Sequence, residues 1–423
     1  MNFRNMSKNC KNAGRRNSMK LKPAAIEAGE KNKNFGKGYY LFLMVLLGML
    51  SAFGPFVTDL YLPTLPSLAR IFQTTSTQVQ MGLSMSMAGL SVGQVFFGPL
   101  SDKYGRRPVL LASLILFCVS TVACIFSPDI VFFNICRLLQ GLGGAGAIVL
   151  SRSVATDCYS GRELVKTLAI IGAINGIAPV TAPVIGGLVA SSIGWKGIFE
   201  ILLGIGAVLL ILCLPLKESL DADKKFKGKL PQLFKGFVEL LHKRKFNSYV
   251  LIYAFASGVL FSYISSASFI MQNNYGYSEL VFSLFFGLNA IGIAIGSGLT
   301  LRFRNIGNAS IFGAAGICLA VLLQFAGYFL SGSFIAYEST TFLMMFSVGF
   351  VFTSTSSIAM EAGREHTGAA SAIFGAAGFL AGAVVSPLAG LGNIQTTTMF
   401  VILVSGILCL LFSILGKRNP AVS

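Results

Sequence analysis

Apolar stretches of about 20 residues recur along the whole chain, separated by short segments rich in Gly, Pro and charge. A helix of about 20 residues is long enough to cross the hydrocarbon core of a bilayer. The pattern therefore predicts an all-α integral membrane protein with twelve transmembrane helices. They are expected at about residues 39–65, 78–99, 108–127, 130–153, 165–190, 195–216, 247–271, 280–301, 309–331, 338–360, 367–389 and 394–415.

The composition agrees with a membrane protein and excludes a large soluble one. Charged residues make up 12% of the 423 residues, which is about half the share in an ordinary soluble domain. The chain has no HExxH zinc motif and no phosphate-binding P-loop, so an enzyme is not expected. Its eight cysteines form no CxxC pair, so neither a metal site nor a disulfide framework is expected.

The positive charges indicate an orientation. The chain has 33 Lys and Arg against 16 Asp and Glu, a formal net charge of +17. With both termini on one side of the membrane, nearly all Lys and Arg fall on that side. Only Arg70 and Lys196 fall on the other side, and Arg137 lies inside a span. Because basic loops mark the cytoplasmic side, both termini are predicted to be cytoplasmic. Contact with anionic lipid accounts for the charge, so no nucleic-acid partner is expected.

The spans divide into two sets of six. A long basic segment, Lys217–Phe246, separates them, as in transporters built from two repeated halves. The predicted division is a disordered basic cytoplasmic tail over residues 1–38, a first six-helix bundle over 39–216, a cytoplasmic linker over 217–246, a second six-helix bundle over 247–415 and a cytoplasmic tail over 416–423.

The most specific motif is GPLSDKYGRRP, Gly98–Pro108, in the predicted cytoplasmic turn between spans 2 and 3. It resembles the G-x-L-[SA]-D-[RK]-x-G-R-[RK] signature of the major facilitator superfamily. The resemblance implies a latch between the two halves, in which an acid at the inner end of span 4 completes a charge network. The latch residues are Gly98, Asp102, Gly105, Arg106, Arg107 and Asp157. The alternative is an ordinary basic loop with a tight turn, which explains the arginines but not Asp102.

Two further motifs agree with this resemblance. RLLQGLGGAG, Arg137–Gly146, resembles the R-x-x-Q-G segment of proton-linked members. Its GLGGAG letters match a dinucleotide-binding fingerprint, but no strand precedes them, so the glycines are interpreted as a helix-packing face. GAINGIAPVTAPVIGGL resembles the antiporter signature, and its matching residues are Gly172, Pro179, Pro183, Gly186 and Gly187. The alternative for this segment is an ordinary helix kinked by proline.

A fourth segment, TDLYLPTLPSL at Thr58–Leu68, narrows the resemblance to drug:proton antiporters of the Bcr/CflA (bicyclomycin/chloramphenicol resistance) type. The resemblance implies the major facilitator fold of two six-helix bundles, as a monomer in the bacterial inner membrane, with no cofactor. The implied function is proton-coupled efflux of small amphiphilic molecules by alternating access. The alternatives are a transporter of a dedicated natural substrate, such as a siderophore or metabolite, and a transporter-like sensor.

Three charged residues lie well inside predicted spans: Asp59, Arg137 and Glu200. A charge at the bilayer centre costs about 2.5–3.5 kcal/mol, so each is a candidate for proton coupling. Burial favours the protonated form of an acid, whereas a nearby arginine favours the charged form. We therefore predict that Asp59 carries the proton and that Arg137 tunes it from across the central cavity. The alternatives are that Asp59 caps the outer end of its helix and that Glu200 is an interfacial residue.

The second half supplies aromatic and neutral polar side chains for the cavity. The candidates for its wall are Tyr253, Phe261, Tyr263 and Asn289, and no charge is found well inside spans 7 to 12. An aromatic wall facing an acid suits a neutral or cationic amphiphile. The alternative is that these aromatic residues only pack together or face lipid.

Overall fold

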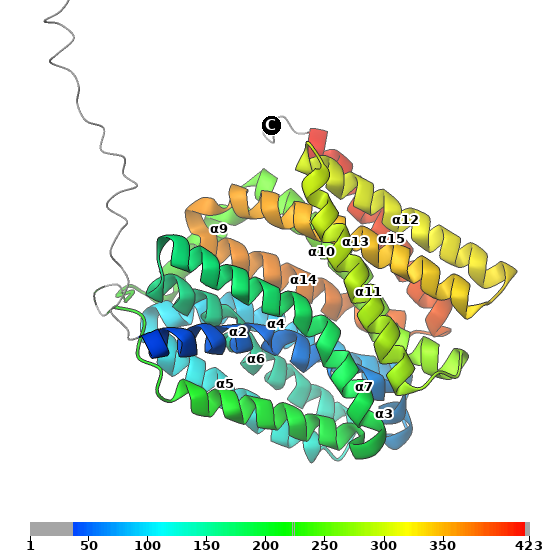
Figure 1. The fold of residues 1–423 in the computed structure, drawn as a ribbon, viewed down its shortest axis with the longest axis horizontal. Helices are drawn as coiled ribbons and strands as arrows, with labels where there is room; N and C mark the ends of the chain where they lie inside the picture. The colour runs from blue at the N-terminus through cyan, green and yellow to red at the C-terminus, as the bar shows by residue number, and fades with distance from the viewer. Residues whose placement is uncertain (1–36, 222, 224, 419–423) are drawn as a thin grey trace, which may run out of the picture.

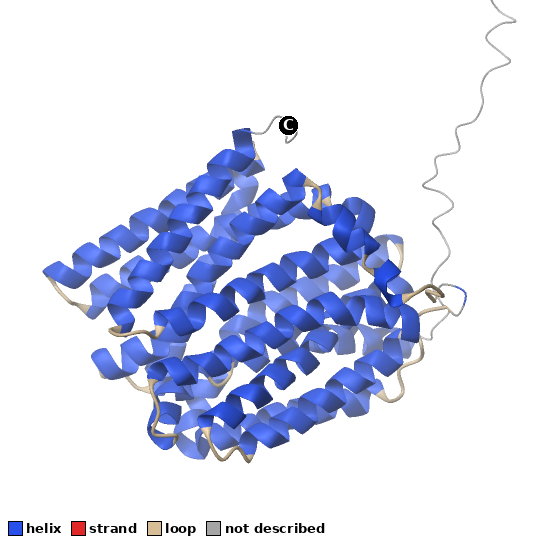
Figure 2. Cartoon of the chain, turned by 180° about the vertical axis from the view of Figure 1, so that it is seen from behind, coloured by secondary structure: helices blue, strands red, loops and turns tan. Residues whose placement is uncertain are grey.

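The computed structural model describes residues 37–221, 223 and 225–418, and within them it contains helices and no strands (Figure 1 and Figure 2). The predicted tail over residues 1–38 lies almost wholly outside the described residues. The long helices are α2 Lys37–Asp59, α4 Ser76–Tyr104, α5 Arg106–Ile125, α6 Ile130–Cys158, α7 Gly161–Cys213, α10 Arg244–Phe269, α11 Glu279–Leu299, α12 Ile306–Leu330, α13 Phe334–Ala362, α14 Thr367–Ala389 and α15 Ile394–Arg418. The short ones are η1 Leu62–Thr64, α3 Leu65–Ile71, α8 Leu230–Leu233, α9 Lys235–Leu241, η3 Ile270–Asn274, η4 Thr300–Arg302 and η5 Arg364–His366.

The described helices include eleven that are long and apolar enough to cross a membrane. One of them, α7, has 53 residues and contains two predicted spans, because its backbone breaks at Gly194 with φ 62° and ψ −173°. Glycine adopts this conformation readily because it has no Cβ. The fold thus has the twelve membrane-crossing segments that the sequence pattern predicts. Spans 5 and 6 are joined by a break in one helix instead of a separate loop.

The helices form two groups that correspond to the two halves of the sequence. Helices α2 to α7 pack mainly on one another, and so do α10 to α15. Figure 1 shows the first group from blue to green and the second group from yellow-green to red. The halves meet along two seams, α4 against α14 and α7 against α11. This is the architecture of two six-helix bundles that the sequence predicts.

Glycines bring helices of the first half into close contact. A Cβ on Gly141 of α6 would come within 2.0 Å of the Ser86 carbonyl oxygen of α4. A Cβ on Gly143 would come within 2.6 Å of the Phe117 backbone nitrogen of α5. The GLGGAG segment therefore packs backbone against backbone inside a membrane helix, and its interpretation as a helix-packing face is confirmed.

Hydroxyl groups of α4 hold the seam to α14. Ser91 Oγ donates to the Ala376 carbonyl oxygen at 2.8 Å, and Thr77 Oγ1 donates to the Gly390 carbonyl oxygen at 2.7 Å. Ser91 also belongs to a G-x-S-x-G sequence at residues 89–93. A hydrolase nucleophile in that motif lies on a strand-to-helix turn, whereas Ser91 is buried in the middle of α4. Its hydroxyl joins the two halves.

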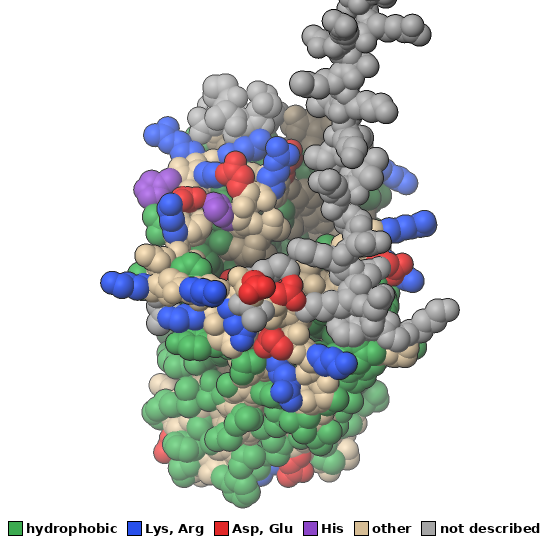
Figure 3. Space-filling view, turned by 90° about the vertical axis from the view of Figure 1, so that its left-hand side faces the viewer, with side chains coloured by type: hydrophobic (Ala, Val, Ile, Leu, Met, Phe, Trp, Pro, Cys, Tyr) green, Lys and Arg blue, Asp and Glu red, His purple; other side chains and the backbone are tan. Residues whose placement is uncertain are grey.

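Lys and Arg side chains gather at one end of the bundle, which we call the basic end. Figure 3 faces this end and shows them over its upper and middle part, above a hydrophobic lower flank. The linker joins the second half here, because Glu239 Oε2 of α9 is 2.7 Å from His366 Nε2, and Lys243 Nζ is 2.5 Å from Glu365 Oε2. That this end faces the cytoplasm is a prediction from the positive-inside rule.

Candidate functional site

A cavity of about 530 Å³ lies between the two halves. Its wall comes from α2 and α7 of the first half and from α10, α11, α13 and α14 of the second, and it is mostly aromatic or aliphatic. The polar side chains of the wall are Thr58, Asp59, Tyr263, Asn289 and Ser297. A cavity of this size with few polar groups suits a small amphiphilic molecule.

Asp59 is the only acid in this cavity wall among the described residues. It is the last residue of α2 and is 4% exposed, and its Oδ1 has no hydrogen-bond partner within the described part of the chain. A helix C-terminus presents carbonyl acceptors and the negative end of the helix dipole, so a carboxylate there does not cap the helix. This argues against the capping alternative. The structure presents Asp59 to the cavity.

Arg137 is fully buried in the first half and is not part of the cavity wall. Its Nη2 donates to the Val57 carbonyl oxygen of α2 at 3.0 Å, and its Nη1 donates to Gln140 Oε1. Its guanidinium lies over the Tyr61 ring, 4.3 Å from the ring centroid. Among the residues that the structure describes, it forms no ion pair with Asp59. The predicted pair of charges facing each other across the cavity is therefore not found. Arg137 instead holds the backbone just before Asp59.

Glu200 lies on the surface of α7, beyond the break at Gly194. Its side chain is exposed and is not part of the cavity wall. This position favours the interfacial alternative over a second proton site. The sequence places Glu200 within a span, but only the packing of α7 shows which face of the helix carries it.

The prolines of the antiporter-like motif lie along α7 at different depths of burial. Pro179 lines the cavity and Pro183 is buried. Gly172, at the start of the motif, is exposed, and a Cβ on it would meet no atom within 4 Å. The motif therefore contributes to the cavity through Pro179 and not through its first glycine.

The two later glycines of the motif permit close contacts of α7. A Cβ on Gly186 would come within 2.0 Å of the Leu60 carbonyl oxygen, next to Asp59. A Cβ on Gly187 would come within 2.2 Å of Ser283 Oγ of α11, in the other half. These glycines let α7 approach both the end of α2 and the second half.

The turn between α4 and α5 brings together the three charged residues of the predicted network. Gly105 ends α4 with φ 105°. Arg106 Nη1 is 2.5 Å from Asp102 Oδ1, and Arg106 Nε is 2.8 Å from Asp157 Oδ2 of α6. A Cβ on Gly98 would make only ordinary contact, 3.6 Å from a Val149 methyl group. A close approach at Gly98 is therefore not required in this arrangement.

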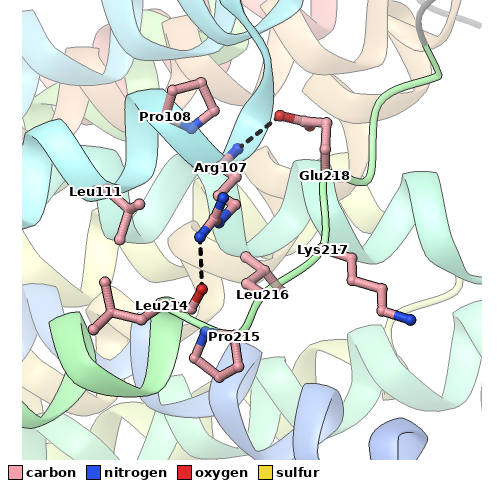
Figure 4. A pocket seen from close by; sticks show the side chains of 8 residues that line it. All are labelled: Arg107, Pro108, Leu111, Leu214, Pro215, Leu216, Lys217 and Glu218. Atoms are coloured by element: carbon pink, nitrogen blue, oxygen red, sulfur yellow. Dashed lines mark hydrogen bonds between the residues drawn. The ribbon is translucent and has the colours of Figure 1, made fainter.

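Glu218, at the start of the linker, completes this turn and was not predicted from the sequence. Its Oε1 accepts a hydrogen bond from the Arg106 N–H at 2.9 Å, and its Oε2 accepts one from the Arg107 N–H at 3.3 Å. Figure 4 shows Glu218 reaching Arg107, whose Nη2 donates to the Leu214 carbonyl oxygen at 2.7 Å. A carboxylate is stabilised at a helix N-terminus by the free N–H groups and the helix dipole.

The contacts of this turn join it to α6 and to the linker. A Cβ on Gly105 would lie 2.4 Å from Glu218 Oε2, so a side chain there would displace the carboxylate. The described ion pairs of Asp102 and Arg106 stay within the first half. A direct contact between the halves at this end comes instead from Arg152 Nη1, which donates to Ser371 Oγ at 2.9 Å. The latch between halves stays a prediction.

Removing the Glu218 carboxylate is expected to destabilise this turn. Glu218→Ala should lower the free energy of unfolding by about 1–2 kcal/mol, the usual effect of losing a side chain that caps a helix N-terminus. Thermal unfolding of the purified protein measures this as a lower Tm. Asp223→Ala, which removes an exposed acid from the same linker, should leave Tm unchanged. An unchanged Tm for Glu218→Ala would contradict the capping role.

Three of the four predicted cavity residues of the second half line the cavity, namely Phe261, Tyr263 and Asn289. Tyr253 does not, and its assignment to the cavity is wrong. It lies about two helical turns before Phe261 on α10, toward the basic end. Its ring stacks on Phe374 with the centroids 3.8 Å apart, beside a separate hollow of about 360 Å³.

Glu338 is a buried acid next to the cavity that the sequence did not reveal. Helix α13 begins at Phe334, so Glu338 lies inside the helix and not at its edge. It is 6% exposed, and its Oε1 accepts a hydrogen bond from Asn289 Nδ2 at 2.8 Å. The same amide lies 2.9 Å from Tyr263 Oη. The expectation that spans 7 to 12 contain no charge well inside them is therefore wrong.

Two helical bundles around a shared cavity, with a charged turn at one end, are the architecture of a membrane transporter. Residues 41–387 match the Major Facilitator Superfamily, and the chain belongs to this family. The family consists of transporters.

Proteins with similar sequences support the resemblance to Bcr/CflA proteins. The chain is 36% identical to "Uncharacterized MFS-type transporter YdgK" of Bacillus subtilis, over 85% of this chain and 91% of that protein. It is 26% identical to the "Bicyclomycin resistance protein homolog" of Haemophilus influenzae, over 90% and 96%. It is 32% identical to the "Chloramphenicol resistance protein" of Pseudomonas aeruginosa, over 64% of each chain. The resemblance to this type of exporter is confirmed by these relatives.

Solved structures show the same fold. A bacterial homolog of the human lysosomal transporter Spinster, in an inward-facing and unoccupied conformation, matches with a TM-score of 0.73 and 16% identity, over 91% of this chain and 98% of that chain. The xylose transporter XylE of E. coli, in a partially occluded inward-open conformation, matches with a TM-score of 0.70 and 15% identity, over 90% and 98%. At such identities the likeness concerns the fold alone.

Proposed function

We propose that this protein exports small amphiphilic molecules, drugs or antibiotics, across the bacterial inner membrane in exchange for protons. The observation that carries the proposal is Asp59, the acid in an otherwise largely apolar wall that both halves share. A carboxylate in such surroundings is costly unless water or a cation reaches it. Whether Asp59 is protonated therefore depends on the side of the membrane to which the cavity opens. This dependence couples the movement of protons to the movement of substrate. The drug-resistance names of relatives support the substrate class.

Arg137 acts in this scheme as a positioning residue. Its hydrogen bond to the Val57 carbonyl oxygen fixes the end of α2 that carries Asp59. Movement of α2 relative to α6 changes that hydrogen bond, so the protonation of Asp59 is linked to the conformation of the first half. Glu200 takes no part in the exchange because it faces away from the cavity.

The two halves are proposed to rock about the central cavity. We place them at residues 39–216 and 247–415, joined by a linker at 217–246, with both termini in the cytoplasm and one copy of the chain as the working unit. The glycines of α7 allow the seam to α11 to slide, and the turn at Asp102 and Arg106 acts as the latch that opens and closes at the cytoplasmic side.

The membrane potential supplies enough free energy for export. One elementary charge that crosses 100 mV is worth about 2.3 kcal/mol. Each factor of ten in concentration corresponds to about 1.4 kcal/mol. One net charge per cycle at 100 mV therefore supports roughly a fiftyfold substrate gradient.

Inside-out membrane vesicles with an imposed proton gradient test this function. Lipophilic antibiotics and dyes, both neutral and cationic, are added one at a time, and release of the proton gradient is followed. Release that depends on both the protein and a compound is expected. If no compound of the panel moves protons, drug export is contradicted.

A dedicated natural substrate is the second candidate. The relative of 36% identity, named an uncharacterized transporter, agrees with either candidate because its name states no substrate. With a dedicated natural substrate the panel of drugs fails, whereas concentrated extract of the cells' own small metabolites releases the proton gradient in the same vesicles. A sensor would move nothing in either assay.

A further inference from the structure

A polar cluster of Glu338, Asn289 and Tyr263 joins helices α13, α11 and α10 of the second half. These side chains are 6%, 1% and 3% exposed, in that order. Two acceptor oxygens of the cluster, Glu338 Oε2 and Asn289 Oδ1, have no hydrogen-bond partner among the described residues. Buried polar atoms are almost always paired. The cluster therefore has the chemistry to accept a proton or a positively charged group.

Two of the three members of this cluster line the central cavity. Tyr263 and Asn289 line the cavity, and Glu338 lies directly behind the Asn289 amide. Asp59 belongs to the same wall, on the side of the first half. Each half thus brings one acid to the cavity. Asp59 is part of the cavity wall, and Glu338 lies behind the wall and is hydrogen-bonded to the wall residue Asn289.

The surroundings of Glu338 are neutral. Within the described residues it forms no ion pair with Lys, Arg or His. The polar and titratable groups that interact with it are the Asn289 amide and the phenols of Tyr263 and Tyr337, and Tyr275 and Gln324 lie against Tyr337. A carboxylate at this place has no protein cation to balance it, so its counter-charge is a proton or a ligand.

We propose that Glu338, Asn289 and Tyr263 form a cation-binding subsite, in which the positively charged group of an amphiphilic substrate replaces a proton. The inference rests on the proposed function and specifies its substrate class. The Glu338 carboxyl releases its proton to water in the cavity, and the carboxylate then pairs with the substrate cation. The Tyr263 ring adds a cation–π contact. When the substrate leaves, the carboxylate takes up a proton from water, and no covalent bond of the substrate changes.

Binding of tetraphenylphosphonium to the full chain in lipid nanodiscs tests this subsite. This probe is a permanent monovalent cation, so only the protein titrates. The parent protein is Asp59→Asn, which removes the other acid of the cavity. Its Kd for the probe is expected to be about tenfold lower at pH 8 than at pH 6, because at the lower pH protons compete with the probe for the Glu338 carboxylate. Adding Glu338→Gln should abolish this pH dependence and raise Kd at pH 8 about tenfold.

Two control variants accompany this test. Glu361→Gln removes an exposed acid from the same helix α13 and should leave Kd unchanged at both pH values. Asn289→Ala keeps the acid but removes its hydrogen-bond partner, so it should change Kd at pH 8 while keeping the pH dependence. The proposal is overturned if the parent does not bind the probe, or if Glu338→Gln binds it with the Kd and the pH dependence of the parent.

The failure of this subsite can be told apart from the failure of the proposed function. Vesicles carrying Glu338→Gln and an intact Asp59 are given the neutral compounds of the drug panel. Proton release by neutral compounds should persist, whereas release by cationic compounds should be lost. Equal release by both kinds of compound overturns the subsite but leaves proton exchange at Asp59 standing. Absence of release with every compound in the unchanged protein contradicts the proposed function itself.

Discussion

Asp59→Asn is expected to abolish proton-driven transport of a neutral substrate while leaving exchange of that substrate intact. Asparagine has nearly the same shape as aspartate, but it does not take up or release a proton. In liposomes containing the purified protein, 100 mV supports roughly a fiftyfold substrate gradient through one net charge per cycle. We expect this accumulation to disappear in the variant. Exchange of labelled for unlabelled substrate without a gradient needs no net proton movement, and it should continue.

Glu200→Gln is the matched control for this result, because it removes an acid of the same half that faces away from the cavity. It should accumulate substrate like the unchanged protein. Accumulation by Asp59→Asn at the unchanged level would contradict the role of Asp59 as the proton carrier. Loss of exchange together with accumulation would indicate that the carboxylate is needed for substrate binding as well.

Gly187→Val is expected to slow substrate exchange strongly without unfolding the protein. A Cβ on Gly187 would come within 2.2 Å of Ser283 Oγ and 2.9 Å of the Glu279 carbonyl oxygen, both on α11. Overpacking of this kind costs about 1–3 kcal/mol. It acts on the seam between the halves, where the proposed rocking takes place. We therefore expect exchange to slow by roughly 10- to 100-fold, measured as the rate of labelled substrate exchange in liposomes.

Gly172→Val provides the control for this prediction. Gly172 lies on the same helix and in the same motif, but a Cβ there would meet no atom within 4 Å. Both variants should elute as single species in gel filtration, which shows that they fold. Exchange by Gly187→Val at the rate of Gly172→Val would show that close contact at this seam is not required.

The sequence was sufficient for the helices and their grouping. A segment inside a bilayer must satisfy its own backbone hydrogen bonds, so each long apolar run becomes a helix. What the sequence did not show is the break at Gly194, where α7 continues with only a change of backbone conformation. A glycine between two apolar runs does not distinguish a loop from a kink.

Asp59, Tyr263 and Asn289 were predicted correctly as cavity residues, because each lies at the depth of the cavity and on the side of its helix that faces the cavity. Arg137 is at a suitable depth, but its side chain points into its own half, toward the Val57 carbonyl oxygen. Packing decides which face of a helix points toward the cavity. In a helix without a clear polar face, the spacing of residues in the sequence does not reveal that face.

Two functional candidates were missed for different reasons. Glu338 stands at the edge of an apolar run, where a boundary error of a few residues decides whether an acid is inside or outside the membrane. Glu218 lies in a basic linker, where a single acid gives no signal. Its role depends on the chain returning to the start of α5, far away in the sequence. Such a contact is visible only in three dimensions.

Simultaneous recording of proton and substrate movement is the most direct test of proton exchange by this protein. Liposomes containing the purified protein are loaded with a neutral substrate found in the vesicle panel, and a pH-sensitive dye reports protons while radiolabel reports substrate. An imposed substrate gradient is expected to drive protons in the opposite direction at a fixed ratio, and Asp59→Asn is expected to abolish this proton movement. Substrate movement without any proton movement, at every pH gradient applied, would contradict proton exchange.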